Sequence, residues 1–256
     1  MSTPSIILYD ATGKNKPWNT ISLKTRMALE YKQIPYRTVW LEYPEIEPTM
    51  LSIGAKPSGV KPDGEPWYTI PVIVDEINPG PDGKPVPITD SWVIAEYLDD
   101  KFPDYPLFPK GSKGLQRLLH ESFIKVALYE TAQLLLPRFY ENFNEASQPY
   151  FRATREGYFR KTFAEMCPKG STEWDETWKC LEKGLNELAA SLDKNGPLMV
   201  NPYAMGKIFS YADITIASAL YTYSTTYPTE WEKMCKWNGG RWGQLLDKCL
   251  ALVTQK

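Results

Sequence analysis

Two short segments in the first half of the chain carry residues that could bind a small peptide. Residues 69–75 (Thr-Ile-Pro-Val-Ile-Val-Asp) are mostly β-branched and apolar, which predicts a strand, yet Pro71 lies inside it. Proline cannot donate a ladder hydrogen bond, so it belongs at a strand's first residue, an edge or a bulge. Pro71 is therefore a candidate for a cis peptide bond. Further along, Asp90 and Ser91 precede the apolar residues 92–94 and predict the start of a helix.

This predicted helix start could hold the amino-acid end of a peptide. The free backbone N–H groups and the positive end of the helix dipole favour a carboxylate, while the Asp90 side chain can pair with an amine. An α-amino acid carries both groups, so a γ-glutamyl peptide is a fitting ligand. Taken singly, Pro71 is equally typical of an edge strand and Asp90 of an ordinary helix cap. Their order along the chain favours a binding site.

The first hundred or so residues alternate between strand and helix patterns. A loop rich in glycine and proline is expected over 54–67, and a hairpin turn over 78–83. The expected order of elements, βαβαββα, is that of a thioredoxin-like α/β domain. Strands are predicted at 6–10, 36–41, 70–75 and 85–88, and helices at 20–33, 44–53 and 90–102.

The rest of the chain is predicted to be almost entirely helical. A proline-rich linker without helical periodicity covers 104–112 and separates an α/β domain, residues 1–103, from an all-α domain, residues 113–256. Pro137 is expected to kink or end the first helix of the second domain. The helices are predicted near 113–143, 149–165, 172–192, 210–223 and 243–253.

One helix start in the second domain is marked by a capping box. Ser210 and Asp213 fit the pattern in which the hydroxyl binds the N3 amide and the acid binds the N-cap amide. Phe209 and Ile214 occupy the two hydrophobic staple positions on either side. The following helix is apolar nearly all round and is expected to be buried. We expect this box to stabilise the fold.

These motifs resemble those of the glutathione transferases, most of all the fungal-specific class A enzymes and, more distantly, the bacterial enzymes that cleave lignin β-aryl ethers. The resemblance implies a thioredoxin-like domain that binds glutathione, followed by an all-helical domain. It spans most of the chain and rests on I-I-L-Y-D at 6–10, K-T-R-M-A-L at 24–29, T-I-P-V-I-V-D at 69–75, T-D-S-W-V-I-A-E-Y-L at 89–98 and S-Y-A-D-I at 210–214.

The residue that would act on the glutathione sulfur is expected at the start of the first helix. Serine- and cysteine-type relatives place theirs seven residues before the helix arginine, a position held here by Asn19. Ser22 and Thr20 are the nearby hydroxyls, and Ser22 is favoured as the donor to the thiolate, aided by the Asn19 amide or backbone N–H groups. The alternative is that these residues only cap the helix. Tyr9 is a weaker candidate, since tyrosine-type relatives place theirs just after the first strand.

The resemblance also implies a set of residues for the other parts of glutathione and for a second substrate. Phe123 and Tyr129 are six residues apart on the predicted long helix and so face different ways, which favours Trp18 and Tyr129 as pocket walls and Phe123 as core. The pocket is expected between the domains. The implied glutathione ligands are the backbone of Ile70 beside cis-Pro71 for the cysteinyl part, Asp90 and Ser91 for the γ-glutamyl end, and Lys56 or Lys61 for the glycyl carboxylate.

Composition excludes several other classes of function. The chain has 256 residues and a net charge of -2, which gives no electrostatic footprint for nucleic acid. No signal peptide or membrane span is evident. The four cysteines form no C-x-x-C pair and the chain has a single histidine, so no metal site is expected. We expect a cytoplasmic protein with reduced thiols that forms a homodimer.

Two classes of function fit the sequence. The first is an enzyme whose glutathione thiolate attacks aromatic electrophiles or aryl ethers, or reduces peroxides. The second is a binding protein that carries aromatic phenolics with little turnover. A transferase-shaped regulator without catalysis is a further alternative. Asn19 at the usual catalytic position favours the carrier, and fold alone does not decide between them.

Overall fold

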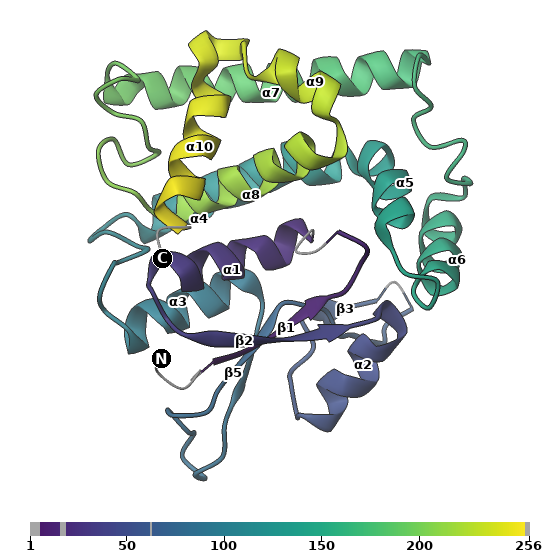
Figure 1. Cartoon of the computed structure of the whole chain (residues 1–256), viewed down its shortest axis with the longest axis vertical. Helices are drawn as coiled ribbons and strands as arrows, with labels where there is room; N and C mark the ends of the chain where they lie inside the picture. The colour runs from purple at the N-terminus through teal and green to yellow at the C-terminus, as the bar shows by residue number, and fades with distance from the viewer. Residues whose placement is uncertain (1–5, 16–18, 62, 254–256) are drawn as a thin grey trace. The chain divides into compact units, whose positions relative to one another are not determined.

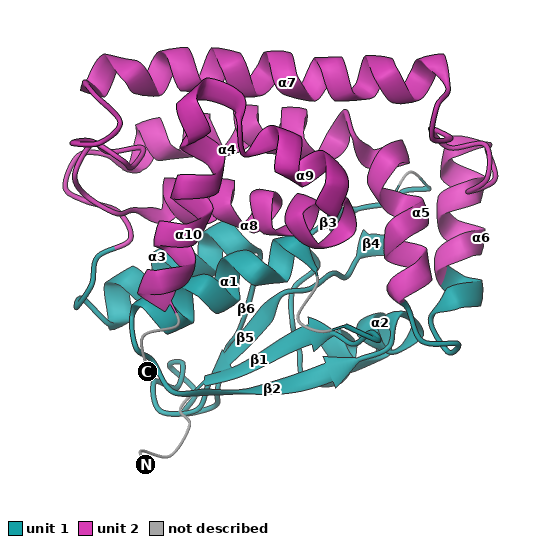
Figure 2. Cartoon of the chain, turned by 45° about the horizontal axis from the view of Figure 1, so that its top comes forward, with its two compact units in different colours: residues 1–106, 143–150 teal, residues 107–142, 151–256 magenta. Residues whose placement is uncertain are grey.

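The computed structural model describes residues 6–15, 19–61 and 63–253 (Figure 1). The chain forms two compact units, coloured separately in Figure 2. The first comprises residues 1–106 together with 143–150, and the second comprises 107–142 and 151–256. The segment 143–150, which follows the first helices of the second unit in sequence, thus belongs to the first unit.

The first unit is built on a four-stranded mixed sheet. Strand β1 (Ile6–Ala11) pairs in parallel with β2 (Tyr36–Leu41), and helix α1 (Thr20–Tyr31) supplies the crossover that a parallel pair requires. On its other edge β1 pairs antiparallel with β5 (Val72–Asp75), which forms a hairpin with β6 (Pro87–Thr89). The strand order β2-β1-β5-β6 confirms the predicted thioredoxin-like arrangement.

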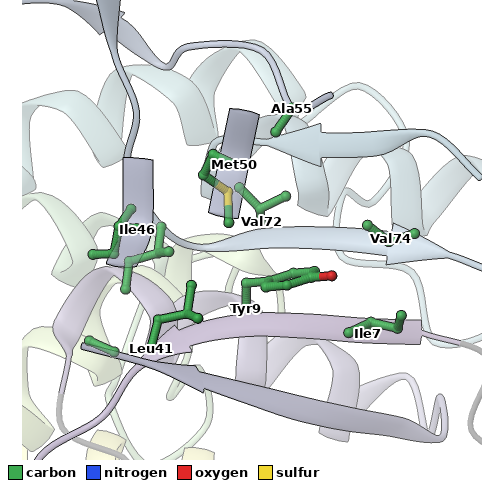
Figure 3. Close-up of a cluster of buried hydrophobic side chains, with 10 residues drawn as sticks. Ile7, Tyr9, Leu41, Ile46, Met50, Ala55, Val72 and Val74 are labelled. Carbon is green, nitrogen blue, oxygen red and sulfur yellow. The ribbon is translucent and has the colours of Figure 1, made fainter. Parts of the chain in front are cut away.

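Helices cover both faces of this sheet. Helix α2 (Tyr43–Ser52) packs on one face, where Ile46 and Met50 join Ile7, Tyr9 and Val72 in a buried cluster (Figure 3). Helices α1 and α3 (Ser91–Lys101) pack against each other on the opposite face (Figure 1). Because side chains alternate along a strand, Tyr9 faces α2 while Asp10 faces α1.

Two details of this unit differ from the predictions. The loop expected over 54–67 contains a small hairpin, β3 (Gly59–Val60) and β4 (Pro66–Trp67). The strand predicted from residue 70 begins only at Val72, because its first residues form the Ile70–Pro71 cis peptide bond. The cis bond itself was predicted and is confirmed.

The second unit is helical, as predicted. A π-helical turn, Lys125–Tyr129, continues the first helix, and short 3-10 turns follow α7 and α9. The short helix α9 was not predicted. The helices are α4 (Lys113–Ile124), α5 (Ala132–Asn142), α6 (Gln148–Phe159), α7 (Thr172–Leu192), α8 (Tyr211–Thr226), α9 (Pro228–Met234) and α10 (Arg241–Val253).

The long helix predicted over 113–143 is interrupted, but not at its proline. The break falls at Glu130 and Thr131, after the π-helical turn, whereas Pro137 lies within α5. Pro137 is the sixth residue of α5, so its ring and missing N–H affect a single backbone bond to the first turn. The prediction that Pro137 ends the helix is wrong.

The predicted capping box of α8 is confirmed. The Ser210 backbone N–H and hydroxyl both donate to Asp213 Oδ2, each over 2.9 Å. The Ala204 N–H donates to Asp213 Oδ1 over 2.7 Å, so the carboxylate also fixes the loop before the helix. Phe209 and Ile214, at the staple positions, are both buried. Asp213 has no exposed surface, which makes this box part of the core.

All four cysteines are free thiols. Across the described ranges, no helix is long and apolar enough to cross a membrane. Within the same ranges, no three His, Cys, Asp or Glu side chains are grouped so that they could hold a metal ion.

Candidate active site

The cis-proline loop and the start of α3 meet at one end of the sheet. Val72, which follows the Ile70–Pro71 cis bond, pairs with Thr89 in the β5–β6 ladder. Asp90 comes next after Thr89, so the chain brings the two predicted peptide-binding segments side by side. Ile70 is 7% exposed, which leaves mainly its backbone for a ligand.

Asp90 is the N-cap of α3 and has an unusual backbone conformation. Its φ of 81° lies in the left-handed region, which is uncommon for non-glycine residues. Its Oδ1 accepts hydrogen bonds from the backbone N–H groups of Trp92, over 2.9 Å, and Val93, over 3.1 Å. These amides were predicted to be open for a ligand carboxylate, and Asp90 itself uses them instead. Its Oδ2 accepts no hydrogen bond from the part of the chain that the structure describes, and the residue is exposed.

The two candidate lysines lie in different surroundings. The Lys61 amine donates a hydrogen bond to Glu47 on α2 over 3.0 Å, and this bond raises the pKa of Lys61. The backbone carbonyl of Lys56, in contrast, accepts a hydrogen bond from Thr89 Oγ1 over 3.0 Å. Lys56 therefore lies next to the Thr89–Asp90 end of the hairpin, and it is exposed.

Asn19 caps helix α1 with one end of its side-chain amide. Its Oδ1 accepts hydrogen bonds from the backbone N–H groups of Ile21, over 2.9 Å, and Ser22, over 3.2 Å. Its Nδ2 donates to no atom of the residues that the structure describes, and the side chain is partly exposed. Because the cap fixes the amide plane, this donor has a defined direction at the positive end of the α1 dipole.

The nearby hydroxyls are placed differently. Ser22 is fully buried on the inner side of α1. Its Oγ lies beside the Asp10 carboxylate but makes no hydrogen bond to any described residue. Thr20 is 4% exposed. Tyr9 belongs to the buried cluster on the α2 face, away from α1 (Figure 3). Among the candidates for the sulfur partner, Asn19 alone combines exposure with an available donor.

The three aromatic candidates do not form a common group in the described structure. Phe123 is 5% exposed and belongs to the core of the helical unit, as expected from its position on α4. Tyr129 ends the π-helical turn and is 73% exposed. Trp18 lies outside the described residues.

Sequence reasoning missed the residues that support the start of α1. Asp10, at the end of β1, forms an ion pair with Arg26 of α1 over 2.9 Å. Burial raises the pKa of Asp10, an effect that the Arg26 guanidinium opposes. An acid at the end of an otherwise apolar strand was the available signal, because a buried carboxylate requires a partner.

Comparison with known proteins places these features among related chains. A family model described as the N-terminal domain of glutathione S-transferase matches residues 20–101, and one described as the C-terminal domain matches residues 114–252. A glutathione S-transferase-like protein of Aspergillus flavus, ustS, is 36% identical over 161 residues, which cover 61% of this chain and 56% of that protein. The chain thus spans about half the length of this curated relative.

Solved structures match over nearly the whole chain. A glutathione S-transferase of Ceriporiopsis subvermispora, determined in complex with glutathione, is 32% identical, covers 97% of both chains and has a TM-score of 0.87. Glutathione transferase GSTFuA2 of Phanerochaete chrysosporium is 35% identical, covers 98% of both chains and has a TM-score of 0.85.

Proposed function

Because the chain belongs to the glutathione S-transferase family, we propose that it binds glutathione in its thioredoxin-like unit and transfers it to hydrophobic aromatic electrophiles. The predicted resemblance to the fungal transferases is confirmed. The observation that carries the proposal is the cis Ile70–Pro71 bond beside Asp90, whose Oδ2 is available at the start of α3. The comparison structure from Ceriporiopsis supports glutathione as the ligand.

In the proposed site, different residues of the first unit bind the three parts of glutathione. The backbone of Ile70, beside cis-Pro71, pairs with the cysteinyl part as an added strand would. Asp90 Oδ2 binds the γ-glutamyl amine, and Ser91, at the first position of α3, binds the adjacent carboxylate. For the glycyl carboxylate we favour Lys56, because Lys61 is engaged by Glu47 and Lys56 adjoins Thr89.

We propose that the Asn19 amide donates its hydrogen bond to the glutathione sulfur. This bond and the positive end of the α1 dipole both lower the pKa of the thiol, so that the thiolate forms at neutral pH. The thiolate then forms a carbon–sulfur bond with the electrophile, and the leaving group departs with the bonding electrons. Ser22, which the sequence favoured as the donor to the thiolate, is fully buried on the inner side of α1.

The aromatic part of the proposal rests on the composition of the chain, of which 13% is aromatic. Trp18 and Tyr129 remain our candidates for contacts with the aromatic molecule. A homodimer also remains a proposal, supported by Leu115 and Leu118, which are 65% and 63% exposed one turn apart on α4. In a carrier, phenolic ligands would bind without turnover, so the rate of the parent protein with aromatic electrophiles distinguishes the two functions.

Replacing Asp90 with asparagine is expected to weaken glutathione binding about tenfold or more, because it removes a charge-assisted hydrogen bond to the γ-glutamyl amine. Asparagine is as good an N-cap as aspartate, so the start of α3 is retained. Isothermal calorimetry with glutathione measures the effect.

Asp82 provides the matched control for this experiment. It is exposed and its Oδ1 accepts a backbone N–H, from Lys84 over 3.2 Å, as Asp90 does at α3. Asp82→Asn is expected to bind glutathione as tightly as the parent chain. Equal affinity of Asp90→Asn and the parent would rule out this position for the γ-glutamyl end.

Replacing Asn19 with alanine or aspartate is expected to lower the turnover number roughly a hundredfold, the effect of losing one donor to a developing or full anion. Aspartate keeps the helix cap but replaces the donor with a negative oxygen, so it also raises the pKa of the bound thiol. Steady-state rates with an aromatic electrophile, measured across pH, test both effects.

Ser22→Ala is the control, because this hydroxyl is buried and makes no hydrogen bond within the described chain. Its rate is expected to equal that of the parent. The opposite pattern, a slow Ser22→Ala and unchanged Asn19 variants, would transfer the role to Ser22. A parent protein that binds phenolics but turns over no electrophile would favour the carrier.

A further inference from the structure

Asp10 is a buried carboxylate that the proposed glutathione contacts do not use. It lies at the end of β1 and is 1% exposed. Its Oδ1 accepts the backbone N–H of Ala11 over 2.8 Å, and its Oδ2 accepts Arg26 Nη2 over 2.9 Å. A buried ion pair of this kind contributes little net stability compared with an apolar pair, so its presence points to another role.

The Arg26 guanidinium is held in place from the β2 side. Its Nη1 donates to Tyr36 Oη over 3.1 Å and to Thr38 Oγ1 over 3.3 Å. Its planar group also lies 4.9 Å from the ring centre of Trp40. Tyr36, Thr38 and Trp40 alternate along β2 and therefore share one face. Asp10 thus binds a cation whose position the sheet has already fixed.

The same pair supports the first turn of α1. Arg26 lies four residues after Ser22, so both face the same side of the helix, toward Asp10. The buried Ser22 hydroxyl lies beside the Asp10 carboxylate, and the Ser22 backbone N–H donates to Asn19 Oδ1 over 3.2 Å. The Asp10–Arg26 pair and the Ser22 backbone N–H therefore hold the same first turn of α1, which carries the side chain of Asn19.

We propose that Asp10 and Arg26 are positioning residues for the glutathione sulfur, because they fix the first turn of α1 and with it the direction of the Asn19 amide. The inference rests on the proposed function. Arg26 from α1 is the cation that faces Asp10, and Tyr36 from β2 accepts from Arg26 and donates to Glu30 Oε1 over 2.7 Å. A shift of the turn would move the Asn19 donor away from the sulfur, and small displacements of this kind strongly lower the rate of an enzyme.

The test is a double-mutant cycle with Asp10→Asn, Asn19→Ala and the double variant. In the parent background Asp10→Asn is expected to lower the turnover number about tenfold, while the glutathione affinity from calorimetry stays unchanged. In the Asn19→Ala background the same change is expected to have less than about a twofold effect, because the donor it positions is already absent. Arg26→Lys, which keeps the charge but loses the two-armed contact, is expected to follow the same pattern and replaces Asp10→Asn if that variant does not fold.

Asp75→Asn is the matched control. Asp75 is equally buried, in β5 of the same sheet, but it pairs opposite Ile6 at the other end of β1 and binds Tyr97 and Asn78. It is expected to lower the melting temperature without changing turnover. Equal effects of Asp10→Asn in both backgrounds, or loss of turnover in Asp75→Asn to the same degree, would overturn the inference. If Asn19→Ala itself leaves turnover unchanged, the proposed sulfur partner fails instead.

Discussion

Replacing Asp213 with alanine is expected to lower the free energy of unfolding by about 3–5 kcal/mol, because three buried donors lose their acceptor at once. These donors are the backbone N–H groups of Ala204 and Ser210 and the Ser210 hydroxyl, at 2.7–2.9 Å. Neither water nor another side chain can replace the carboxylate without a rearrangement, since Asp213 and Ser210 have no exposed surface. Chemical denaturation followed by circular dichroism measures the change.

This loss is expected to depend on pH in a defined direction. Burial raises the pKa of Asp213 to about 7, from an ordinary value of 3.8. A folded state with the higher pKa binds the proton more tightly, so the stabilisation by protonated Asp213 is complete below about pH 4 and is lost as the pH rises to about 7. The parent should therefore become less stable, relative to Asp213→Ala, as the pH rises from about 4 to about 7. A difference between the two proteins that stays constant over this range would contradict the raised pKa.

Ser210→Ala gives the matched comparison at the same site. It removes one hydroxyl donor and the N-cap contact but leaves the carboxylate bound to two backbone N–H groups. We expect a smaller loss, about 0.5–2 kcal/mol, which is typical of an N-cap. Equal losses for Ser210→Ala and Asp213→Ala would show that Asp213 contributes only as a cap.

The capping box shows which features could be predicted from the sequence. Ser210 and Asp213 are three residues apart, so their interaction follows from local helix geometry. The same holds for the order of strands and helices in the first unit, which follows from the alternation of patterns and the handedness of the crossover. The start of α5 could not be predicted in this way, because the π-helical turn before Thr131 is contacted by a distant helix: Tyr223 Oη of α8 donates to the Ala127 carbonyl over 2.8 Å.

The parts of the candidate site that could not be predicted depend on distant residues or on backbone detail. The sequence left open whether Asp90 or a ligand would bind the first amides of α3, because an aspartate at this position fits both; in the structure Asp90 Oδ1 accepts from Trp92 and Val93. The Asp10–Arg26 pair joins residues 16 apart across a helix and a strand. The docking of Ser147 on Glu42 and Tyr43 spans more than a hundred residues, and it explains why the segment 143–150 belongs to the first unit.

The second large effect is expected at Lys32, the residue that follows helix α1. Its side chain has no exposed surface and its amine donates to Asp99 of α3 over 2.8 Å. The same amine donates to the carbonyl oxygens of Asp104, over 3.0 Å, and Tyr105, over 3.2 Å. Lys32 thus joins α1, α3 and the start of the predicted linker within the first unit.

Lys32→Met is expected to lower the free energy of unfolding by about 3–5 kcal/mol, because it removes the buried amine that donates to the Asp99 carboxylate and to two carbonyl groups. Lys101→Met is the matched control: Lys101 also pairs with an aspartate, Asp100 at 3.6 Å, but both side chains are exposed and the expected loss is at most about 1 kcal/mol. Lys32→Met combined with Asp99→Leu should recover part of the loss, since the carboxylate that loses the Lys32 amine is then absent. Denaturant titration of the parent, Lys32→Met, Lys101→Met and the double variant measures these free energies of unfolding. If Lys32→Met is no less stable than Lys101→Met, the buried amine does not hold these segments together.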